Sequence, residues 1–544
     1  MMKDKLKKKR AAWSLFLLPL MMVFPMGLAF PADELFDETK VITLFGFDQG
    51  SIPFTENLSI KMRQPVKYPK NPVVPRGPAG SPDSWAVQFY GSVVRDNGKF
   101  RMWYVAAGDD RLDRSGPRSA PWRVAYAESA DGVTWTKPNL GLVEYMGSKE
   151  NNLVKVDPSP LGILNVKVLH EPEARPAERY KMSAHVWFKK GAKGARFGTL
   201  ALFLSPDGLD WTSVSGVKPV EAELTREDMV LPWAHYEPAG GLYKWDGLYY
   251  TSGQNAYAAA LPYHGRVVRS FVSGDFKNWE PASAVGFVRT AQHDLLGAGK
   301  SRDGEQTHEG ISVWDRKNVL LGVYGIWHGD LEWKGVTIDL GFVVSTDGVN
   351  FREPSHDWHF IRIGNDKEWD QGGLLQGQGF ENVGDQTYVY YGAWDPRGWK
   401  GSPPRGGVGI VTLPRDRFGD LVVEKNSIGM GEYQVPDLAA SFVTADVSLK
   451  RKSPQRFYVN AEGLGPQAGL EIELLGADLQ PLPGYSGTDA AMVRENGFQT
   501  PVSWKGKTQV EGLPERIRIR VTYEGESMTD IRFCALYIKD AATP

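Results

Sequence analysis

Ser129-Ala-Asp131-Gly-Val-Thr-Trp135 is the stretch of sequence that decides the fold, because its pattern returns along the chain. Each copy contains Ser, one further residue, Asp, usually Gly, and an aromatic residue four positions after the Asp. The other copies are Ser205–Trp211, Ser273–Trp279 and Ser345–Phe351, with a degenerate copy at Leu413–Phe418. The Asp residues are separated by 76, 68, 72 and 69 positions. One structural unit is therefore repeated about five times.

Each unit has the sequence features of several short antiparallel strands. The Asp-Gly pair favours the positive φ of a tight turn, and the aromatic residue after it packs back onto the sheet. Alternating apolar segments such as Leu200–Leu204 precede the turn, and a second hairpin pattern such as Tyr243–Tyr250 lies earlier in the unit. Four strands in about seventy residues are typical of a propeller blade. The alternative is an array of β-sandwiches or a solenoid.

The repeat ends near Ile428, and the pattern changes. Segments such as Arg516-Ile-Arg-Ile-Arg-Val521 alternate charged and apolar residues, as strands do when one face is solvated. We therefore expect an all-β chain with three parts. They are a signal peptide at 1–29, a five-bladed β-propeller at 30–427 and a β-sandwich at 428–544.

The N-terminus has the features of an export signal. Basic residues occupy most positions from 3 to 10, and an uncharged apolar run follows from Trp13 to Phe30. Gly27 and Ala29 provide small residues at a signal-peptidase site. The alternative is a membrane anchor, because the run approaches the length that spans a bilayer. In both cases the folded part is expected outside the cytoplasm, periplasmic or extracellular, and after cleavage no stable membrane insertion is expected.

The composition excludes several classes of partner and site. The 544 residues include 63 basic and 65 acidic side chains, so no overall field favours nucleic acid. The only cysteine, Cys534, excludes intramolecular disulfides and cysteine-based metal sites. No calcium-loop or histidine-cluster spacing is present. We therefore predict neither cofactor nor metal, although a propeller channel is able to hold structural Ca²⁺.

Acidic, histidine and aromatic residues recur near the start of each unit. They are Asp83 and Trp85 in the first unit, His170 and Glu171 in the second, Trp233, His235 and Glu237 in the third, His308 and Glu309 in the fourth, and Asp370 in the fifth. Glycoside hydrolysis needs an acid and a second carboxylate on either side of the scissile bond. Glu237 is the strongest candidate, because neighbouring rings favour sugar stacking and desolvation of its carboxyl group. The alternative is that these residues form ordinary turns.

These units resemble the five-bladed propeller glycoside hydrolases. The families concerned are the invertase and levanase family, the arabinanase and xylosidase family, and related families that act on marine polysaccharides (families 32, 43 and 117). The chain looks most like family-32-like secreted hydrolases. The segments Tyr126–Gly141 and Gly147–Leu153 carry the likeness. The resemblance covers the propeller and, more loosely, the C-terminal region.

The resemblance implies a role for one carboxylate in each of the first three blades. Asp83 would be the nucleophile or base, Glu171 would orient the transition state, and Glu237 would be the general acid. The second-blade position usually reads Arg-Asp-Pro, and here His-Glu-Pro stands in its place. The usual first-blade motif with Asn is missing, so Asp48 is a rival to Asp83. Some relatives use a His as the acid, which makes His308 a rival to Glu237.

The sequence therefore predicts a secreted glycoside hydrolase with carbohydrate as its partner. The single axial pocket of a propeller suits a chain end, which favours exo action. The remaining site residues, Trp85, His170, Trp233, His235, His308, Glu309 and Asp370, are expected to contact the substrate. The alternatives are a glycoside phosphorylase on the same fold and a non-catalytic carbohydrate-binding protein. A sialidase is disfavoured, because the Asp turns of that family are one residue longer.

Overall fold

The computed structural model describes residues 35–112, 122–190, 195–218, 225, 228–231, 236–255, 266–283, 285–289, 306–328, 335–356, 358–394, 405–424, 439–449 and 453–541. These residues form β-strands and a few short 3-10 helices, so the all-β prediction is confirmed. The 3-10 helices include Glu38–Lys40, Asp109–Leu112, Pro176–Glu178, Gly487–Asp489 and Met528–Asp530. Within this described part, no helix has the length and apolarity needed to cross a membrane. The predicted signal peptide lies outside the described residues.

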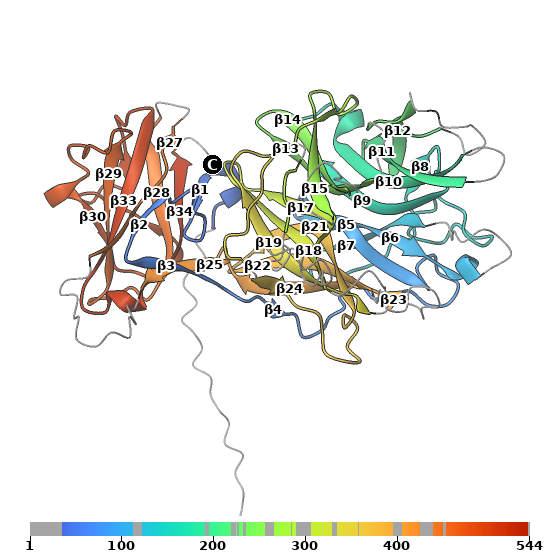
Figure 1. The fold of residues 1–544 in the computed structure, drawn as a ribbon, viewed down its shortest axis with the longest axis horizontal. Coiled ribbons are helices and arrows are strands. Elements are labelled where there is room, and N and C mark those ends of the chain that lie inside the picture. Colours follow the sequence, from blue (N-terminus) through green and yellow to red (C-terminus); the bar gives the residue numbers. More distant parts are fainter. Residues whose placement is uncertain are drawn as a thin grey trace, which may run out of the picture. The chain divides into compact units, whose positions relative to one another are not determined.

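Consecutive strands in the middle of the chain pair antiparallel in five groups, which we call blades 1 to 5 (Figure 1). Blade 1 contains β5 (Ala86–Asp96), β6 (Lys99–Ala107) and β7 (Arg123–Ser129). Blade 2 contains β9 (Gly162–His170), β10 (Tyr180–Lys190), β11 (Ala195–Ser205) and β12 (Asp210–Ser215), with β8 (Lys155–Asp157) parallel to β12. Blade 3 contains β13 (Tyr236–Trp245), β14 (Leu248–Asn255), β15 (Val267–Ser273) and β16 (Glu280–Pro281). Blade 4 contains β17 (Gln306–Asp315), β18 (Leu320–His328), β19 (Thr337–Ser345) and β20 (His359–Ile361). Blade 5 contains β21 (Gly373–Val383), β22 (Gln386–Trp394), β24 (Val408–Pro414) and the N-terminal β4 (Val66–Lys67).

The first strands of the five blades form a closed ring. β5 contacts β9, β9 contacts β13, β13 contacts β17, β17 contacts β21, and β21 returns to β5. Strand pairs between distant segments close the ring. In blade 5, β4 pairs with β24, and between blades 5 and 1, β23 (Arg405–Gly406) pairs with β5. Segments far apart in the sequence thus complete neighbouring sheets, as propellers do to protect their edges. The five-bladed propeller stays a prediction, which this closed ring supports.

The repeated Asp turn joins the third strand of a blade to its outer segment. In the first copy, Asp131 Oδ1 accepts backbone N–H bonds from Val133 and Thr134 at 2.9 and 2.7 Å. The indole of Trp135 donates to the carbonyl of Gly132 at 2.9 Å. Gly132 has φ 79°, a conformation that side chains disfavour. The two backbone bonds recur at Asp207, Asp275 and Asp347, and the indole bond recurs at Trp211 and Trp279, so the repeat read from the sequence is a repeated turn.

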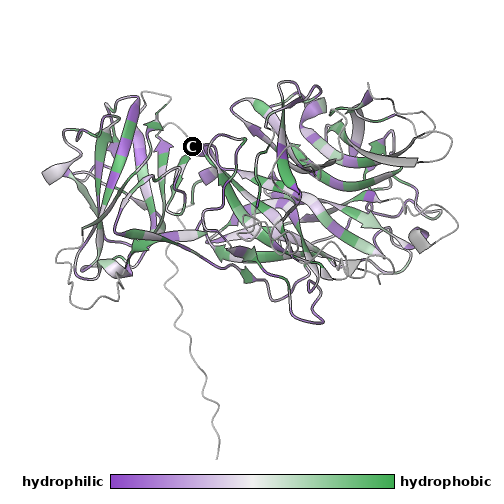
Figure 2. Cartoon of the chain, in the orientation of Figure 1, coloured by the Kyte–Doolittle hydropathy of each residue, from purple (hydrophilic) through white to green (hydrophobic). Residues whose placement is uncertain are grey.

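Two further sheets share one apolar core near the C-terminus. The first contains β1 (Ile42–Phe45), β3 (Leu58–Met62), β25 (Gly419–Val423), β28 (Gln455–Glu462), β31 (Gly497–Pro501), β32 (Gln509–Val510) and β34 (Arg532–Asp540). The second contains β2 (Phe54–Glu56), β26 (Ala440–Val443), β27 (Val447–Ser448), β29 (Gly469–Gly476), β30 (Ala491–Val493) and β33 (Arg516–Glu524). Apolar residues of β33 are buried and alternate with polar ones (Figure 2). This alternation places Ile517, Ile519 and Val521 in the shared core, which supports the predicted sandwich.

The N-terminal strands belong to these two sheets. β1 pairs with β34, β2 with β26, and β3 with β25. The sequence division at 428 had assigned all of these residues except β26 and β34 to the propeller. No local pattern marks the difference, because β1 to β3 are short strands whose partners lie more than three hundred positions away. Both ends of the propeller sequence therefore contribute strands to the C-terminal sheets.

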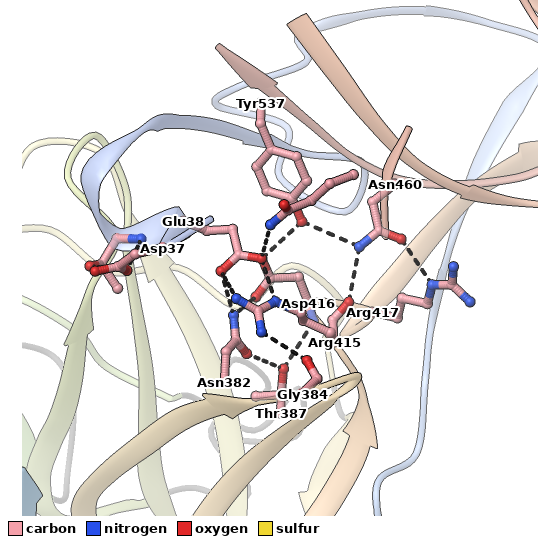
Figure 3. A network of polar contacts seen from close by, with 12 residues as sticks. Asp37, Glu38, Asn382, Gly384, Thr387, Arg415, Asp416, Arg417, Asn460 and Tyr537 are labelled. Atoms are coloured by element: carbon pink, nitrogen blue, oxygen red, sulfur yellow. Dashed lines mark hydrogen bonds and ion pairs between the residues drawn. The ribbon is translucent and has the colours of Figure 1, made fainter. Parts of the chain in front are cut away.

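A buried polar network lies where the fifth Asp turn meets the C-terminal strands (Figure 3). Asp416 and Arg316 are fully buried and form two hydrogen bonds of 2.6 and 2.7 Å. Tyr537 of β34 donates to the same carboxylate at 2.8 Å. Arg415 pairs with Glu38, and Asn460 of β28 donates to the carbonyl of Arg415 at 2.9 Å. The degenerate fifth copy of the repeat thus provides ion pairs and hydrogen bonds that connect blades 4 and 5 with the C-terminal sheets.

Candidate functional site

The ring of innermost strands is irregular at the same level in all five blades. Each strand loses register with its partner there, at a bulge that inserts unpaired residues. The residues at or next to these bulges are Gln88, Asn165, Glu237, His308 and Gln376. Bulges re-aim side chains and are frequent beside active sites. A ring of polar residues therefore surrounds the centre of the blades.

We call the described side chains around this ring the axial cluster. Its members are Tyr90, Asn165, Lys167, Gln254, Arg266, His308, Glu309, Trp327, Gln376 and Trp394. They come from all five blades. Direct contacts join them across blade boundaries, so the cluster is one connected site.

Glu309 is the carboxylate of the axial cluster. Its Oε2 accepts a hydrogen bond of 3.1 Å from Asn165 Nδ2 of blade 2, and its backbone N–H donates to Gln254 Oε1 of blade 3 at 3.1 Å. Its backbone has φ 61°, a region that costs a non-glycine residue free energy and that is found mainly where the surroundings require it. Gly310 follows with φ 76°. Glu309 is half-buried, and blade 2 holds its carboxylate while blade 3 holds its backbone N–H.

His308 lies next to Glu309 and is buried. Its Nδ1 is 3.0 Å from the hydroxyl of Tyr90, and its ring lies 5.6 Å from Trp327 and 6.3 Å from Trp394. Burial, and then the charge of Arg266, hold the pKa of His308 well below its usual value. The imidazole is therefore neutral at pH 7 and is able to accept as well as donate a hydrogen bond.

Lys167 lies on β9, two residues after Asn165. It is fully buried, and its ammonium donates to the carbonyl oxygens of Gln376 and Gly91 at 3.2 and 3.4 Å. Burial lowers the pKa of Lys167 to about 7, although the nearby carboxylate of Glu309 acts in the opposite direction. A lysine with this pKa exchanges its proton near neutral pH, which is the range where acid and base catalysts work best.

The burial of Lys167 predicts a pH-dependent stability. An unfolded lysine has a pKa of about 10.4, so between pH 7 and 10 the unfolded chain holds a proton that the folded chain has released. The cost of burying the charge is therefore complete below pH 7 and disappears above pH 10. Lys167→Met is expected to raise the unfolding free energy by a few kcal/mol at pH 6, about the cost of a shift of this size. The gain should fade by pH 10.

Denaturant unfolding of both proteins at pH 6, 8 and 10 measures this effect. Lys155→Met is the matched control, because Lys155 is 46% exposed and pairs with Asp210 at 3.0 Å. The control should show no comparable pH trend. An unfolding free energy of Lys167→Met that differs from wild type by the same amount at every pH would contradict the lowered pKa.

Asp83, the predicted first-blade carboxylate, does not contact the axial cluster in any described interaction. It is buried beside β6, where it accepts hydrogen bonds from Tyr104 Oη at 2.7 Å and Lys137 Nζ at 2.6 Å. It lines a cleft of about 230 Å³, together with Lys137, Tyr145 and Asn152. Asp48, its rival, accepts bonds from Ser51 and Arg352 and has no described contact with the cluster either.

Asp370 of blade 5 repeats the arrangement of Asp83. It precedes β21 and accepts hydrogen bonds from Tyr391 Oη at 2.8 Å and Lys67 Nζ at 2.6 Å. In both blades the tyrosine follows the aspartate by 21 positions. The same Asp–Tyr–Lys arrangement in two blades is expected of a group that stabilises the blade structure. This stabilising role explains why an acidic residue recurs before these innermost strands.

Glu171 follows the far end of β9, six residues beyond Asn165. At the rise of an extended strand this separation is about 20 Å. Its carboxylate contacts Lys181 and Lys244 at 2.7 Å and Tyr249 Oη at 2.8 Å. Burial raises the pKa of Glu171, but the hydrogen bonds from the two lysines outweigh it and the pKa falls. Glu171 therefore links blades 2 and 3 at a distance from the axial cluster.

The remaining predicted residues lie in different parts of the chain. His170 stacks on Tyr180 with ring centres 4.5 Å apart, at the same end of β9 as Glu171. Trp85 precedes β5 and packs against Trp122 at 6.1 Å. Trp233 and His235 lie outside the described residues. Of Glu237 the backbone is described, and it pairs with Gln254 of β14.

His308 and Glu309 are thus the predicted side chains that the structure places in the axial cluster, and Glu237 lies on the strand beside them. Sequence reasoning missed the other members of the cluster, which are Tyr90, Asn165, Lys167, Gln254, Arg266, Trp327, Gln376 and Trp394. A usable signal was the glycine inside the innermost strands, as at Gly91, Gly240, Gly310 and Gly377, because glycine inside a strand often marks a bulge.

Comparisons with known proteins give matches to solved structures. No family model and no curated protein matches the chain. One solved structure is a glycosyl hydrolase from Bacteroides ovatus, with 15% identity, a TM-score of 0.43, and coverage of 66% of this chain and 95% of that chain. A second has 16% identity, a TM-score of 0.41, and coverage of 65% of this chain and 95% of that chain. Its description says that the GH130 family of mannoside phosphorylases contains glycoside hydrolases that target β-1,2 mannosidic linkages in Candida mannan. A third is called a putative glycosidase from Bacteroides thetaiotaomicron, with 16% identity, a TM-score of 0.40, and coverage of 63% and 95%. These three structures are named as glycoside-active proteins.

Proposed function

We propose that the chain is a secreted glycoside hydrolase that acts at the axial cluster, from the end of a poly- or oligosaccharide. The observation that carries the proposal is the position of Glu309. It lies in a ring of bulged strands, is oriented by Asn165, and is flanked by a neutral His308 and by Lys167 with a pKa of about 7. Such shifted groups cluster at functional sites.

Glu237 and Glu309 are the proposed pair of carboxylates. Their strands are neighbours in the ring, and both residues meet Gln254: Glu237 through backbone pairing and Glu309 through its N–H bond. Glu237 gives its proton to the glycosidic oxygen as the bond to the anomeric carbon breaks. Glu309 stabilises the positive charge on the sugar ring or takes the proton of the attacking water. Because Asn165 fixes Glu309 and Tyr90 fixes His308, these groups need little reorganisation during the reaction.

A glycoside phosphorylase is the second candidate, and the cations of the axial cluster favour it. Arg266 lies over the ring of Trp327 at 4.5 Å and donates to Gln254 at 3.1 Å. Lys167 lies on the same ring of strands. Two cationic side chains beside the carboxylate are a suitable place for a phosphate that replaces the attacking water.

Sugar release by the mature protein, residues 30–544, tests both proposals. The purified protein is incubated with plant and marine oligosaccharides, with and without inorganic phosphate. Hydrolysis releases free sugar at the same rate in both conditions. Phosphorolysis releases a sugar 1-phosphate only when phosphate is present. Saturable binding of a sugar without release of either product would contradict both reactions and favour a binding protein.

A further inference from the structure

Two histidines and an aspartate meet on the outer three strands of blade 4. His328 ends β18, Asp339 lies near the start of β19, and His359 begins β20. In the pairing register, Ile326 faces Asp339 and Gly341 faces His359. His328 and His359 are therefore diagonal neighbours of Asp339 on one face of the sheet, and side chains reach each other at such positions.

The ligand atoms of these residues converge. Asp339 Oδ2 lies 2.8 Å from His359 Nδ1 and 3.2 Å from His328 Nε2, and the three atoms all lie within 4.8 Å of one another. Two ligands of a tetrahedral metal ion with bonds near 2.1 Å are separated by about 3.4 Å. An ion therefore enters this group when the Asp339–His359 contact widens from 2.8 Å by about 0.6 Å.

The surroundings also suit a metal ion. The backbone N–H of Ile363 donates to Asp339 Oδ1 at 2.6 Å, which leaves Oδ2 to face both imidazoles. Hydrogen bonds of this kind orient carboxylate ligands in metal sites. Asp339 is 9% exposed at its side chain, and His328 and His359 are 21% and 16% exposed. The carboxylate is shielded, while the histidines leave an approach for the ion and a water ligand.

We propose that His328, Asp339 and His359 bind one divalent transition-metal ion, of which Zn²⁺ is the best example. Two imidazole nitrogens and one carboxylate oxygen form a donor set that zinc and its neighbours prefer, whereas Ca²⁺ and Mg²⁺ require more oxygen ligands. The site differs from the proposed pair of carboxylates, because its ligands lie on β18 to β20 and the axial cluster is built around the innermost strands. It lies at the end of blade 4 where β17 begins, since Gln306 pairs with Trp327 next to His328.

Binding of the metal alone tests this proposal and does not depend on any sugar. The full mature protein is treated with a chelator, dialysed and titrated with Zn²⁺ in a calorimeter. We expect one equivalent to bind. We expect His359→Ala and Asp339→Asn each to weaken binding by more than about 100-fold, because changes outside the ligand shell already cost 10- to 100-fold. His356→Ala is the matched control, since its imidazole lies three residues earlier, is 53% exposed and pairs with Glu353 at 3.1 Å.

Co²⁺ gives a second readout that requires no variant. A tetrahedral Co²⁺ site with nitrogen and oxygen ligands has intense visible bands, and hexaaqua Co²⁺ has weak ones. One equivalent of Co²⁺ should give the intense bands, and Zn²⁺ should remove them. A wild type that binds no Zn²⁺ and keeps the weak Co²⁺ spectrum would overturn the proposal. So would Zn²⁺ affinity that is unchanged in folded His359→Ala and lost in His356→Ala.

Discussion

Glu309→Gln is expected to lower kcat on the glycoside substrate by about 10²- to 10⁴-fold, the usual contribution of a general acid or base. The amide keeps the shape of the side chain, and Gln Oε1 is still able to accept the hydrogen bond from Asn165 Nδ2 that Glu309 accepts at 3.1 Å. The negative charge is lost, so the group neither stabilises an oxocarbenium ion nor takes a proton from water. Binding of the substrate should change much less than turnover.

Glu171→Gln is the matched control for this prediction. Glu171 is also a half-buried carboxylate with several hydrogen bonds, but it lies beyond the opposite end of β9 and contacts Lys181, Lys244 and Tyr249. Its replacement removes two ion pairs and is expected to lower stability while kcat stays near that of the wild type. Initial rates on a saturating substrate, with circular dichroism to verify folding, measure both variants. Full turnover in Glu309→Gln, or loss of turnover in Glu171→Gln alone, would contradict the axial site.

Asp416→Asn is expected to lower the unfolding free energy by about 3–5 kcal/mol, because it leaves the buried guanidinium of Arg316 without its counter-charge. Both side chains are 0% exposed, and their two hydrogen bonds are 2.6 and 2.7 Å long. The double variant Arg316→Met/Asp416→Leu removes both charges and should regain much of the loss. Asp210→Asn breaks an exposed pair with Lys155, and about 0–1 kcal/mol is expected there.

The ion pair of Asp416 and Arg316 also predicts how the unfolding free energy changes as the pH falls. Burial raises the pKa of Asp416, but the charge and hydrogen bonds of Arg316 outweigh it, and the pKa is lowered. A carboxylate with a lowered pKa contributes stability that is present above the unfolded value near pH 4 and is lost as the pH falls below it. Denaturant midpoints measured from pH 7 down to pH 3 should therefore converge for wild type and Asp416→Asn. If Asp416→Asn lowers the unfolding free energy at pH 7 by no more than Asp210→Asn does, the proposed role of the buried pair is contradicted.

The repeat was readable from the sequence because it depends on local chemistry. Asp131 bonds to backbone groups two and three residues later, and Trp135 bonds to Gly132. These contacts need fixed residue types at fixed spacing, so they leave a pattern. The same reasoning selected Glu309 and His308 at the start of the fourth unit, and both side chains lie in the axial cluster. Glu237 stays a prediction for its side chain, although its backbone lies beside Gln254.

The residues whose described contacts lie away from the axial cluster are held by contacts between distant parts of the chain. Asp83 and Asp370 share one arrangement with a tyrosine and a lysine, and from the sequence alone a recurring supporting aspartate looks like a recurring catalytic one. Lys167 was missed because a lysine in a strand is ordinarily exposed, and only the packing of five blades buries it. The three proposed zinc ligands come from separate strands of blade 4, with no short motif to mark them.

The position of a bound sugar is the most direct test of the axial site. The measurement is a crystal structure of Glu309→Gln with the oligosaccharide identified by the release assay. We predict that the scissile glycosidic oxygen lies within hydrogen-bond reach of residue 237 and that the anomeric carbon lies next to residue 309, above Asn165 and His308. A sugar bound in the cleft beside Asp83 and Lys137, or on the C-terminal sheets, with none at the axial cluster, would contradict the proposed function.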